Sequence, residues 1–374
     1  RTGNRRLLGR LFHVPFRAAD FSANQASGIN SEDKRMHDCK AWIAGVAGTR
    51  LTPDEIAFFR DEKPWGFILF ARNVESLEQL ADLTAEMRDV TGRDQMPVFV
   101  DQEGGRVQRL RPPLAPNYPP AARIGEIYAR DREAGLRAAW LHARLHAFDL
   151  LKVGINADCL PVLDVPVEGA HDVIGARAYA KDPQAVAEMG RAAAEGLLAG
   201  GVLPVVKHMP GHGRAFADTH KELARVGAPL CDLVAHDFVP FKALKDLPMA
   251  MTAHVIFDCI DPERPSTLSP TVIGTIIRDV IGFDGLVMSD DISMKGLSGE
   301  LDDLAVRIID AGCDMVLYCA GVMEELKKVG PRVPVLKGKA RHRADLAEVY
   351  AGEPDLSDEQ ELRAEFDSLL PAVA

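Results

Sequence analysis

The sequence predicts an α/β protein built around a parallel sheet. Short, almost wholly apolar segments alternate with longer amphipathic segments from Ala41 onward, which is typical of parallel strands covered on both faces. Eight such strand–helix units occupy roughly 300 residues, which suits a TIM (β/α)8 barrel. Polar residues also follow several of the apolar segments directly, and a barrel gathers its functional side chains at those strand ends. We therefore expect a single TIM (β/α)8 barrel.

The expected strands are short and nearly all apolar. They cover Trp42–Val46, Gly66–Phe70, Pro97–Asp101, Ala157–Val165, Leu203–Lys207, Met249–His254, Leu286–Ser289 and Met315–Tyr318. A doubly wound open sheet is the alternative arrangement of the same segments. The barrel is favoured because polar residues cluster at the ends of several different strands. These residues are Asp101, Asp164, Lys207, His208, His254, Asp290 and Asp291.

Amphipathic segments between the strands predict helices. They cover Leu77–Val90, Arg130–Val153, Pro183–Ala199, Asp232–Leu244, Ser269–Val280 and Asp302–Ala311. Ser76, Asp182 and Ser269 stand at helix starts, where such side chains are favoured as caps. Gly154 and Gly312 end helices just before the next strand, as glycine commonly does.

No Gly/Ser-rich linker or shift in composition divides the chain, so we expect one catalytic barrel domain over residues 36–374. Residues 1–35 carry seven basic and three acidic side chains, and Arg10 and His13 interrupt their apolar stretch. No signal-peptide core is therefore predicted, and we expect residues 1–35 to be a disordered N-terminal extension. The tail from about Val335 is charged and helix-forming, and we expect it to pack on the outside.

Charge and composition narrow the classes of partner. Lys plus Arg number 44 and Asp plus Glu number 55, which gives a net charge of −11. An acidic surface argues against nucleic acid and anionic membranes as partners, and no apolar run approaches the ~20 residues that span a bilayer. The six cysteines form no CxxC pair, and we expect reduced, buried thiols. These features favour a soluble cytoplasmic protein. We expect a monomer or weak oligomer.

A charged run follows the third expected strand. Residues 101–109 read Asp-Gln-Glu-Gly-Gly-Arg-Val-Gln-Arg, and the two glycines allow a tight turn. A carboxylate and a guanidinium at a strand end, here Asp101 and Arg109, can bind sugar hydroxyls through charge-assisted hydrogen bonds. The same two side chains could instead form a structural ion pair that closes the loop.

The loop after the fifth expected strand is the most informative segment. Residues 207–213 read Lys-His-Met-Pro-Gly-His-Gly, and residues 218–220 read Asp-Thr-His. Proline and glycine exclude regular structure here, and functional residues often lie in loops at strand ends. Asp218 and His220 are two residues apart, so extended backbone directs both to one side and the carboxylate can hold the imidazole. An imidazole with a pKa near ~6.5 can give and take a proton near neutral pH, which favours a catalytic function.

Two further segments suggest chemistry. The seventh expected strand ends in Ser-Asp-Asp, and adjacent strand residues point to opposite sides. Only one of Asp290 and Asp291 should therefore face the barrel mouth as a candidate nucleophile, unless the pair caps a helix. Arg177 follows a glycine turn and could bind substrate, although a solvated surface arginine fits the same pattern.

Together these segments resemble glycoside hydrolase family 3, and within it the single-domain bacterial β-N-acetylhexosaminidases. The resemblance covers about residues 40–320 and rests on the Asp-Gln-Glu-Gly-Gly run, the Lys-His-x-Pro-Gly-His-Gly loop with its Asp-Thr-His ending, and the Ser-Asp-Asp strand end. It implies a retaining exo-β-N-acetylglucosaminidase that forms a covalent glycosyl-aspartate and needs no metal or cofactor. The implied partners are N-acetylglucosamine-containing glycans or muropeptides, and the implied pathway is peptidoglycan recycling.

The resemblance also implies residue roles. Asp290 matches the nucleophile, His220 the acid/base and Asp218 its dyad partner. The implied sugar-binding residues are Asp101, Arg109, Arg177, Lys207 and His208. The chain departs from the family pattern at Met209, usually Phe, at Thr219, usually Ser, and at Ala176, where an acidic side chain is often found. Only Ala176 bears on the site, because it puts the local support of Arg177 in doubt.

Three alternatives stay open. A metal-dependent TIM-barrel hydrolase could use His208, His212, His254 and Asp290. However, the first strand has no His-x-His pair, and the spacing in residues 207–213 is not that of zinc ligands on one element. A non-catalytic carbohydrate-binding protein fits poorly with an intact set of acidic and histidine residues. A β-glucosidase or β-xylosidase of the same family is disfavoured, because typical β-glucosidases lack the Asp-[Ser/Thr]-His loop and take their acid from a second domain.

Overall fold

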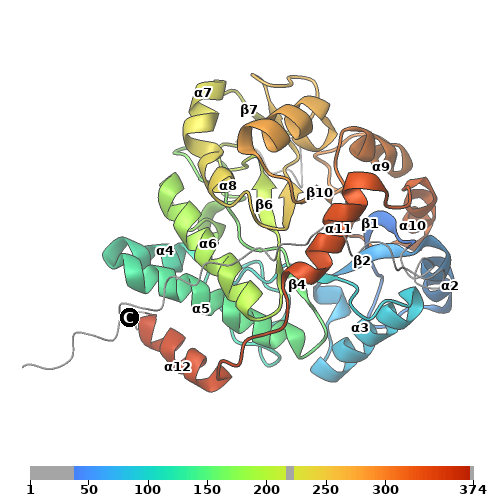
Figure 1. Ribbon diagram of the computed structural model, residues 1–374, viewed down its shortest axis with the longest axis horizontal. Coiled ribbons are helices and arrows are strands. Elements are labelled where there is room, and N and C mark those ends of the chain that lie inside the picture. Colours follow the sequence, from blue (N-terminus) through green and yellow to red (C-terminus); the bar gives the residue numbers. More distant parts are fainter. Residues whose placement is uncertain (1–37, 216–222, 371–374) are drawn as a thin grey trace, which may run out of the picture. The chain divides into compact units, whose positions relative to one another are not determined.

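The computed structural model describes residues 38–215 and 223–370. The expected extension at residues 1–35 lies outside the described residues, so this domain boundary stays a prediction. Within the described residues, the strands lie at the centre and the helices surround them (Figure 1). Each strand is followed by a helical segment that returns the chain to the start of the next strand.

The strands form a closed parallel barrel. In the described part of the chain, the main sheet has the order β5-β4-β3-β2-β1-β11-β10-β8-β6, and every neighbouring pair is parallel. The two edge segments, β5 and β6, are separated only by Val205, so they are halves of one strand and the sheet closes on itself. This confirms the predicted TIM barrel. Its strand segments are β1 (Lys40–Gly45), β2 (Pro64–Leu69), β3 (Val98–Val100), β4 (Ala157–Asp158), β5 (Leu203–Pro204), β6 (Val206–Met209), β8 (Met249–Thr252), β10 (Leu286–Asp291) and β11 (Met315–Tyr318).

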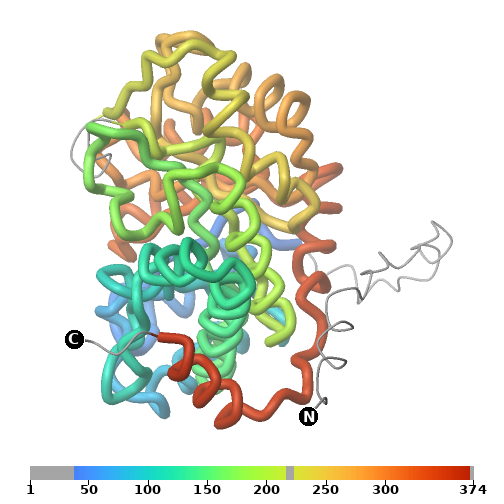
Figure 2. Tube along the Cα trace, turned by 90° about the vertical axis from the view of Figure 1, so that its left-hand side faces the viewer, coloured from blue at the N-terminus to red at the C-terminus, as the bar shows by residue number. Residues whose placement is uncertain are grey.

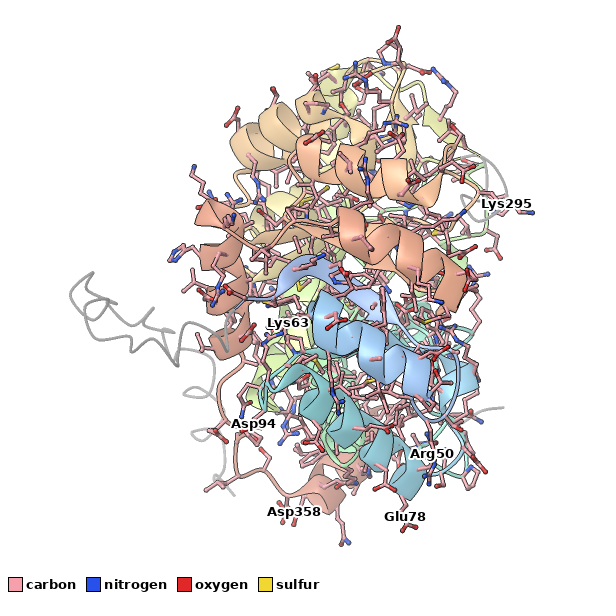
Figure 3. The ribbon with its side chains drawn as sticks, turned by 90° about the vertical axis from the view of Figure 1, so that its right-hand side faces the viewer. Arg50, Lys63, Glu78, Asp94, Lys295 and Asp358 are labelled. Carbon is pink, nitrogen blue, oxygen red and sulfur yellow. The ribbon has the colours of Figure 1, made fainter. Side chains whose placement is uncertain are left out.

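Helices cover the outer face of the barrel and run opposite to the strands. In Figure 3, Lys63 and Asp94, which precede β2 and β3, lie on one side of the molecule. Arg50 and Lys295, which follow β1 and β10, lie on the opposite side. The helices are α2 (Pro53–Glu62), α3 (Leu77–Thr91), α4 (Ala121–Arg130), α5 (Arg132–Leu151), α6 (Pro183–Ala199), α7 (Leu230–Asp232), η3 (Leu233–Asp237), α8 (Val239–Ala243), η5 (Val272–Ile281), α9 (Leu301–Asp310), α10 (Met323–Val329), α11 (Gly338–Tyr350) and α12 (Glu359–Leu369). A separate parallel pair, β7 (Ala224–Val226) and β9 (Val255–Phe257), lies outside the barrel sheet.

The predicted caps are present, and one predicted helix is interrupted. The Ser76 and Asp182 side chains accept hydrogen bonds from the backbone of Gln79 and Ala185, which satisfies donors at the starts of α3 and α6. The helix expected at Asp232–Leu244 is broken into a π-helical turn, η3, and the short α8. Pro240 gives the physical reason, because proline has no N–H to donate to the preceding turn.

Apolar residues pack both inside the barrel and beneath its helices. Trp42, Phe67 and Phe99 are fully buried, as are most other residues of β1, β2 and β3. Strands covered on both faces need no alternation of apolar and polar residues, which explains the continuous apolar runs in the sequence. The barrel therefore supplies a rigid frame for the residues that follow its strands.

The C-terminal tail packs on the outside, as expected. Helix α11 lies at the starts of the strands, where Trp65 Nε1 donates to Glu348 Oε1 at 2.6 Å and Arg343 Nη1 donates to Asp314 Oδ1 at 2.9 Å. Helix α12 lies beside α5 (Figure 2). There Arg363 Nη2 donates to the buried Asp149 Oδ1 at 2.6 Å.

The cysteines are all unpaired, and four of the six are buried. Cys231 and Cys259 are exposed, so the expectation of buried thiols is wrong for these two. Cys231 lies in the short helix α7, which buries none of its residues. No helix in the described ranges combines the length and the apolar character that a membrane span requires.

We predict that Arg363→Met lowers the free energy of unfolding by about 2 kcal/mol, because it leaves the Asp149 carboxylate buried with one fewer cation. Arg307→Met is the control, since Arg307 pairs with Asp303 on the exposed surface of α9 and should contribute less than about 1 kcal/mol. Urea unfolding at pH 7 measures both. Equal losses in the two variants would contradict the buried ion pair.

Candidate active site

Polar side chains from several strands meet at the carboxyl end of the barrel. Asp101 follows β3 directly, Lys207 and His208 lie in β6, and Asp290 lies near the end of β10. Because parallel strands all end on the same side of a barrel, residues far apart in sequence converge there.

A row of alternating charges crosses this end of the barrel. Lys207 Nζ lies 2.9 Å from Asp101 Oδ1 and 2.6 Å from Glu103 Oε1. Asp101 Oδ2 also accepts a hydrogen bond from Arg109 Nη2 at 2.8 Å. Glu103 accepts two from Arg177, through Nε at 2.8 Å and Nη2 at 2.7 Å. These five side chains, which we call the charged cluster, hold three cations and two carboxylates.

The members of the charged cluster keep one another ionised. Burial opposes the charge of Lys207, but Asp101 and Glu103 outweigh it and raise the pKa of the amine above its ordinary value. Burial likewise favours a neutral Asp101, but Lys207 and Arg109 hold the pKa of that carboxyl well below its usual range. Arg177 and Lys207 similarly overcome burial and lower the pKa of Glu103 to about 2. At neutral pH the side chains of the charged cluster are therefore ionised, and their positions are set before a substrate binds.

The structure bears differently on the two structural alternatives that the sequence left open for the arginines. The Asp101–Arg109 ion pair of the first alternative is present, and its Asp101 also contacts Lys207 within the charged cluster. The side chain of Arg177 is only 11% exposed, so a solvated surface arginine is wrong. Ala176 gives Arg177 no charge partner, and Glu103 supplies that support from the loop after β3.

Two features hold the loop after β3 in shape. The Gln102 side chain is fully buried, and its Oε1 accepts the backbone N–H groups of Arg109 at 3.0 Å and Leu110 at 3.1 Å. Gly104 has a φ of +89°, and a Cβ there would lie 2.3 Å from the carbonyl oxygen of Pro119. Only glycine fits both conditions. The loop thus places Asp101 and Glu103 on a fixed backbone.

Asp164 organises the histidine loop. Its Oδ2 lies 2.6 Å from His208 Nδ1, and its Oδ1 accepts the backbone N–H of His212 at 2.7 Å. His208 and His212 help to overcome burial and lower the pKa of Asp164, so the carboxylate only accepts hydrogen bonds. The proton of a neutral His208 ring therefore lies on Nδ1, and Nε2 is directed away from Asp164. Burial lowers the pKa of His212 to about 4, so that ring is neutral near pH 7.

The same loop approaches its neighbour very closely. A Cβ at Gly213 would lie 2.0 Å from the carbonyl oxygen of Val165. The backbone N–H of His171 donates to the carbonyl of Ala215 at 2.9 Å, so the two segments run side by side. This contact fixes the chain up to Ala215. Asp218 and His220, the predicted dyad, lie outside the described residues.

The two carboxylates at the end of β10 have different surroundings. Asp291 accepts hydrogen bonds from Cys319 N at 3.0 Å and from Ser293 Oγ at 2.6 Å, so it joins β10 to β11 and to the following turn. Asp290 is half-buried, and its Oδ1 accepts the Asp291 N–H at 2.8 Å. Burial lowers the pKa of His254, and the charge of nearby Asp290 opposes that shift. The helix-cap alternative is wrong, because the next helix begins only at Leu301.

Sequence reasoning missed the roles of Glu103 and Asp164. Glu103 could have been found, because it lies two residues after Asp101 and extended backbone directs both side chains to one side. Asp164 could have been found as well, because it is a carboxylate at the end of an expected strand.

Both ring nitrogens of His254 have hydrogen-bond partners. These partners are Thr267 Oγ1 at 2.8 Å and the Asp291 carbonyl at 3.0 Å.

We predict that Asp164→Asn costs about 2 kcal/mol of stability at pH 7 and less at pH 3. The folded-state pKa of Asp164 is depressed, so its contribution is present above the unfolded value near ~3.9 and is lost as the pH falls through the folded value. Urea unfolding at the two pH values checks this. The control is Asp303→Asn on the surface of α9. A loss in Asp164→Asn that is the same at both pH values would be inconsistent with an ionised Asp164.

Comparison with known proteins identifies the family. The profile described as "Glycosyl hydrolase family 3 N terminal domain" matches residues 52–345. The chain is 39% identical over 281 residues to a β-hexosaminidase of Xylella fastidiosa, covering 74% of this chain and 82% of that protein. A β-hexosaminidase of Methylococcus capsulatus is 39% identical over 292 residues, covering 75% and 85%.

Solved structures show the same likeness. Native NagZ from Neisseria gonorrhoeae superposes with a TM-score of 0.80 at 31% identity, over 90% of this chain and 99% of that one. The same protein in complex with N-trifluoroacetyl-D-glucosamine gives a TM-score of 0.78 at 30% identity, covering 89% and 97%. The chain is a glycoside hydrolase and belongs to glycoside hydrolase family 3.

Proposed function

We propose that the chain is a retaining exo-β-N-acetylglucosaminidase with Asp290 as its nucleophile. One observation carries this proposal: Asp290 and Asp291 end the same strand, and the contacts of Asp291 are structural. Asp290 is half-buried and lies at the end of the barrel that holds the charged cluster. Side chains at this end can form hydrogen bonds to the hydroxyl groups of a sugar ring.

The charged cluster and His208 suit the recognition of a sugar. Asp101 offers carboxylate acceptors, while Arg109, Arg177 and Lys207 offer charged donors. Hydrogen bonds to ionised groups are stronger than neutral ones, and hydroxyl groups can both donate and accept. Because the cluster is already ionised and ordered, little reorganisation is needed when the substrate binds.

The proposed reaction is a double displacement with retention. The Asp290 carboxylate attacks the anomeric carbon as the glycosidic C–O bond breaks, and His220 donates its proton to the leaving oxygen. Water then attacks the anomeric carbon of the glycosyl-aspartate and passes a proton to His220. The C–O bond to Asp290 breaks in this second step, which releases the sugar and regenerates the carboxylate.

A histidine acid/base replaces the second carboxylic acid that most glycosidases use. An imidazole needs less pKa tuning to hold a proton near pH 7, and it adds no second negative charge beside Asp290. Asp218 stabilises the imidazolium form of His220 and orients its ring. Both roles rest on the resemblance of the Asp-Thr-His segment to the family pattern.

The proposed substrate class is a terminal, β-linked N-acetylglucosamine, as in muropeptides of peptidoglycan recycling. Support comes from relatives named β-hexosaminidase and from a related structure that holds N-trifluoroacetyl-D-glucosamine. We place the activity in the cytoplasm, because six unpaired cysteines fit a reducing compartment. Comparing aryl β-N-acetylglucosaminide with aryl β-glucoside and β-xyloside distinguishes this proposal from the alternatives within the family.

We predict that Asp290→Asn abolishes turnover of an aryl N-acetylglucosaminide, because no carboxylate remains to attack. His220→Ala should slow turnover by ~10²–10⁴-fold, since proton donation is lost while the nucleophile remains. Asp291→Asn is the comparison, and its effect should appear mainly as lost stability. Near-normal release of nitrophenol by Asp290→Asn would overturn the assignment of the nucleophile.

We predict that prolonged dialysis against a strong chelator leaves turnover unchanged, because each proposed step uses only side chains and water. A metal-dependent hydrolase would lose activity and regain it on addition of zinc. Steady-state turnover before chelation, after it and after zinc addition checks this. Loss and zinc-dependent recovery would favour the metal-dependent alternative.

A further inference from the structure

Glu103 lies at the centre of the charged cluster, between two cations delivered by distant parts of the chain. Arg177 lies in the short helical turn at residues 175–177, and Lys207 lies in β6. We propose that Glu103 is a positioning residue that couples Arg177 to Lys207, so that the sugar-binding cations are set as one unit. This inference rests on the proposed function, because it concerns how the same site holds its substrate.

Glu103 forms buried ion pairs with both Arg177 and Lys207. Its side chain is 4% exposed, and those of Arg177 and Lys207 are 11% and 2% exposed. Arg177 uses Nε and Nη2 together, so the planar guanidinium meets the planar carboxylate in two parallel hydrogen bonds. A two-point contact of this kind fixes the plane of the guanidinium as well as its position.

Both carboxylate oxygens of Glu103 are occupied by protein donors. Oε2 accepts from Arg177 Nε, while Oε1 accepts from Arg177 Nη2 and faces Lys207 Nζ. Asp101 differs, because its side chain is more exposed, at 15%. Glu103 therefore acts through its two partners and not as a direct ligand of the sugar.

Charge balance makes Glu103 hard to replace. The charged cluster carries a net charge of +1, from three cations and two carboxylates. The charge of Arg177 opposes protonation of Lys207, so these two cations repel each other across the buried site. Glutamine at position 103 would raise the net charge to +2 and point an N–H donor at two cations. Released from Glu103, Arg177 would keep, among its hydrogen bonds to the described residues, only the one to the Val173 carbonyl, at 3.3 Å.

Aspartate at position 103 would keep the charge but shorten the side chain by one methylene group. It could reach Lys207 or Arg177, but not both in the present geometry. Glu103→Asp thus separates the contribution of charge from that of position. The pair Arg137–Glu365 provides a matched control, because Glu365 also receives Nε and Nη2 of an arginine, each at 2.7 Å, where α12 lies beside α5.

The experiment compares the wild type with Glu103→Gln, Glu103→Asp and Glu365→Gln. Steady-state kinetics on an aryl N-acetylglucosaminide give KM and kcat, and calorimetry gives the Kd for N-acetylglucosamine. We expect Glu103→Gln to raise KM and Kd together by about 10–100-fold, the range for losing a hydrogen bond to a charged group, while kcat falls less. Glu103→Asp should lie between this variant and the wild type, and Glu365→Gln should match the wild type.

A spectroscopic measurement tests the coupling without substrate. The Arg177 Nε–H is buried and donates to Glu103, so its ¹⁵N–¹H signal should exchange slowly in the wild type and in Lys207→Met. The signal should be lost in Glu103→Gln and weakened in Glu103→Asp. This readout also separates the two proposals. The signal could be lost in Glu103→Gln while the wild type is inactive on N-acetylglucosaminides. That combination would overturn the proposed function and keep the positioning role.

Two results would overturn the positioning role. The first is a KM and Kd within twofold of the wild type in Glu103→Gln. The second is a fall in kcat in Glu103→Gln with KM and Kd unchanged, which would assign Glu103 to the chemical step. If Glu103→Gln does not fold, the same criteria apply to Glu103→Asp, because that variant keeps the buried charge.

Discussion

The burial of Lys207 between two carboxylates is the interaction on which the site depends. A buried ammonium is unfavourable unless opposite charges lie beside it, so Asp101 and Glu103 must both be in place for Lys207 to stay ionised. Each carboxylate in turn holds an arginine, and these arginines are expected sugar ligands. One buried cation thereby fixes the positions of four other charged groups before any substrate arrives.

A closed barrel supplies the conditions for that arrangement. The residues of the charged cluster come from loops after β3 and β4 and from β6, and only the shared strand direction brings them together. The barrel residues beneath them are apolar and buried, and an apolar surrounding strengthens the contacts of the buried charges Lys207 and Glu103. At the opposite end of the strands, α11 covers the barrel through contacts such as Trp65–Glu348, so these contacts lie at the other end of the barrel from the proposed sugar site.

Much of the fold and part of the site could be predicted from the sequence. Apolar runs identified the barrel strands, and helix caps such as Ser76 marked where helices begin. Local patterns could not show that Glu103 replaces the support missing at Ala176, because that contact joins segments 74 residues apart. They also missed the break near Pro240 and the exposure of Cys231, which depend on tertiary packing. The roles of Asp218 and His220 rest on the sequence alone, because these residues lie outside the described part of the chain.

The decisive measurement is a crystal structure with N-acetylglucosamine bound. We expect a sugar whose hydroxyls contact Asp101, Arg109 and Lys207, with its anomeric carbon within about 3.5 Å of an Asp290 oxygen. Arg177 should keep both hydrogen bonds to Glu103 in the complex. A sugar bound away from the charged cluster, or an Asp290 carboxylate turned away from the anomeric carbon, would contradict it.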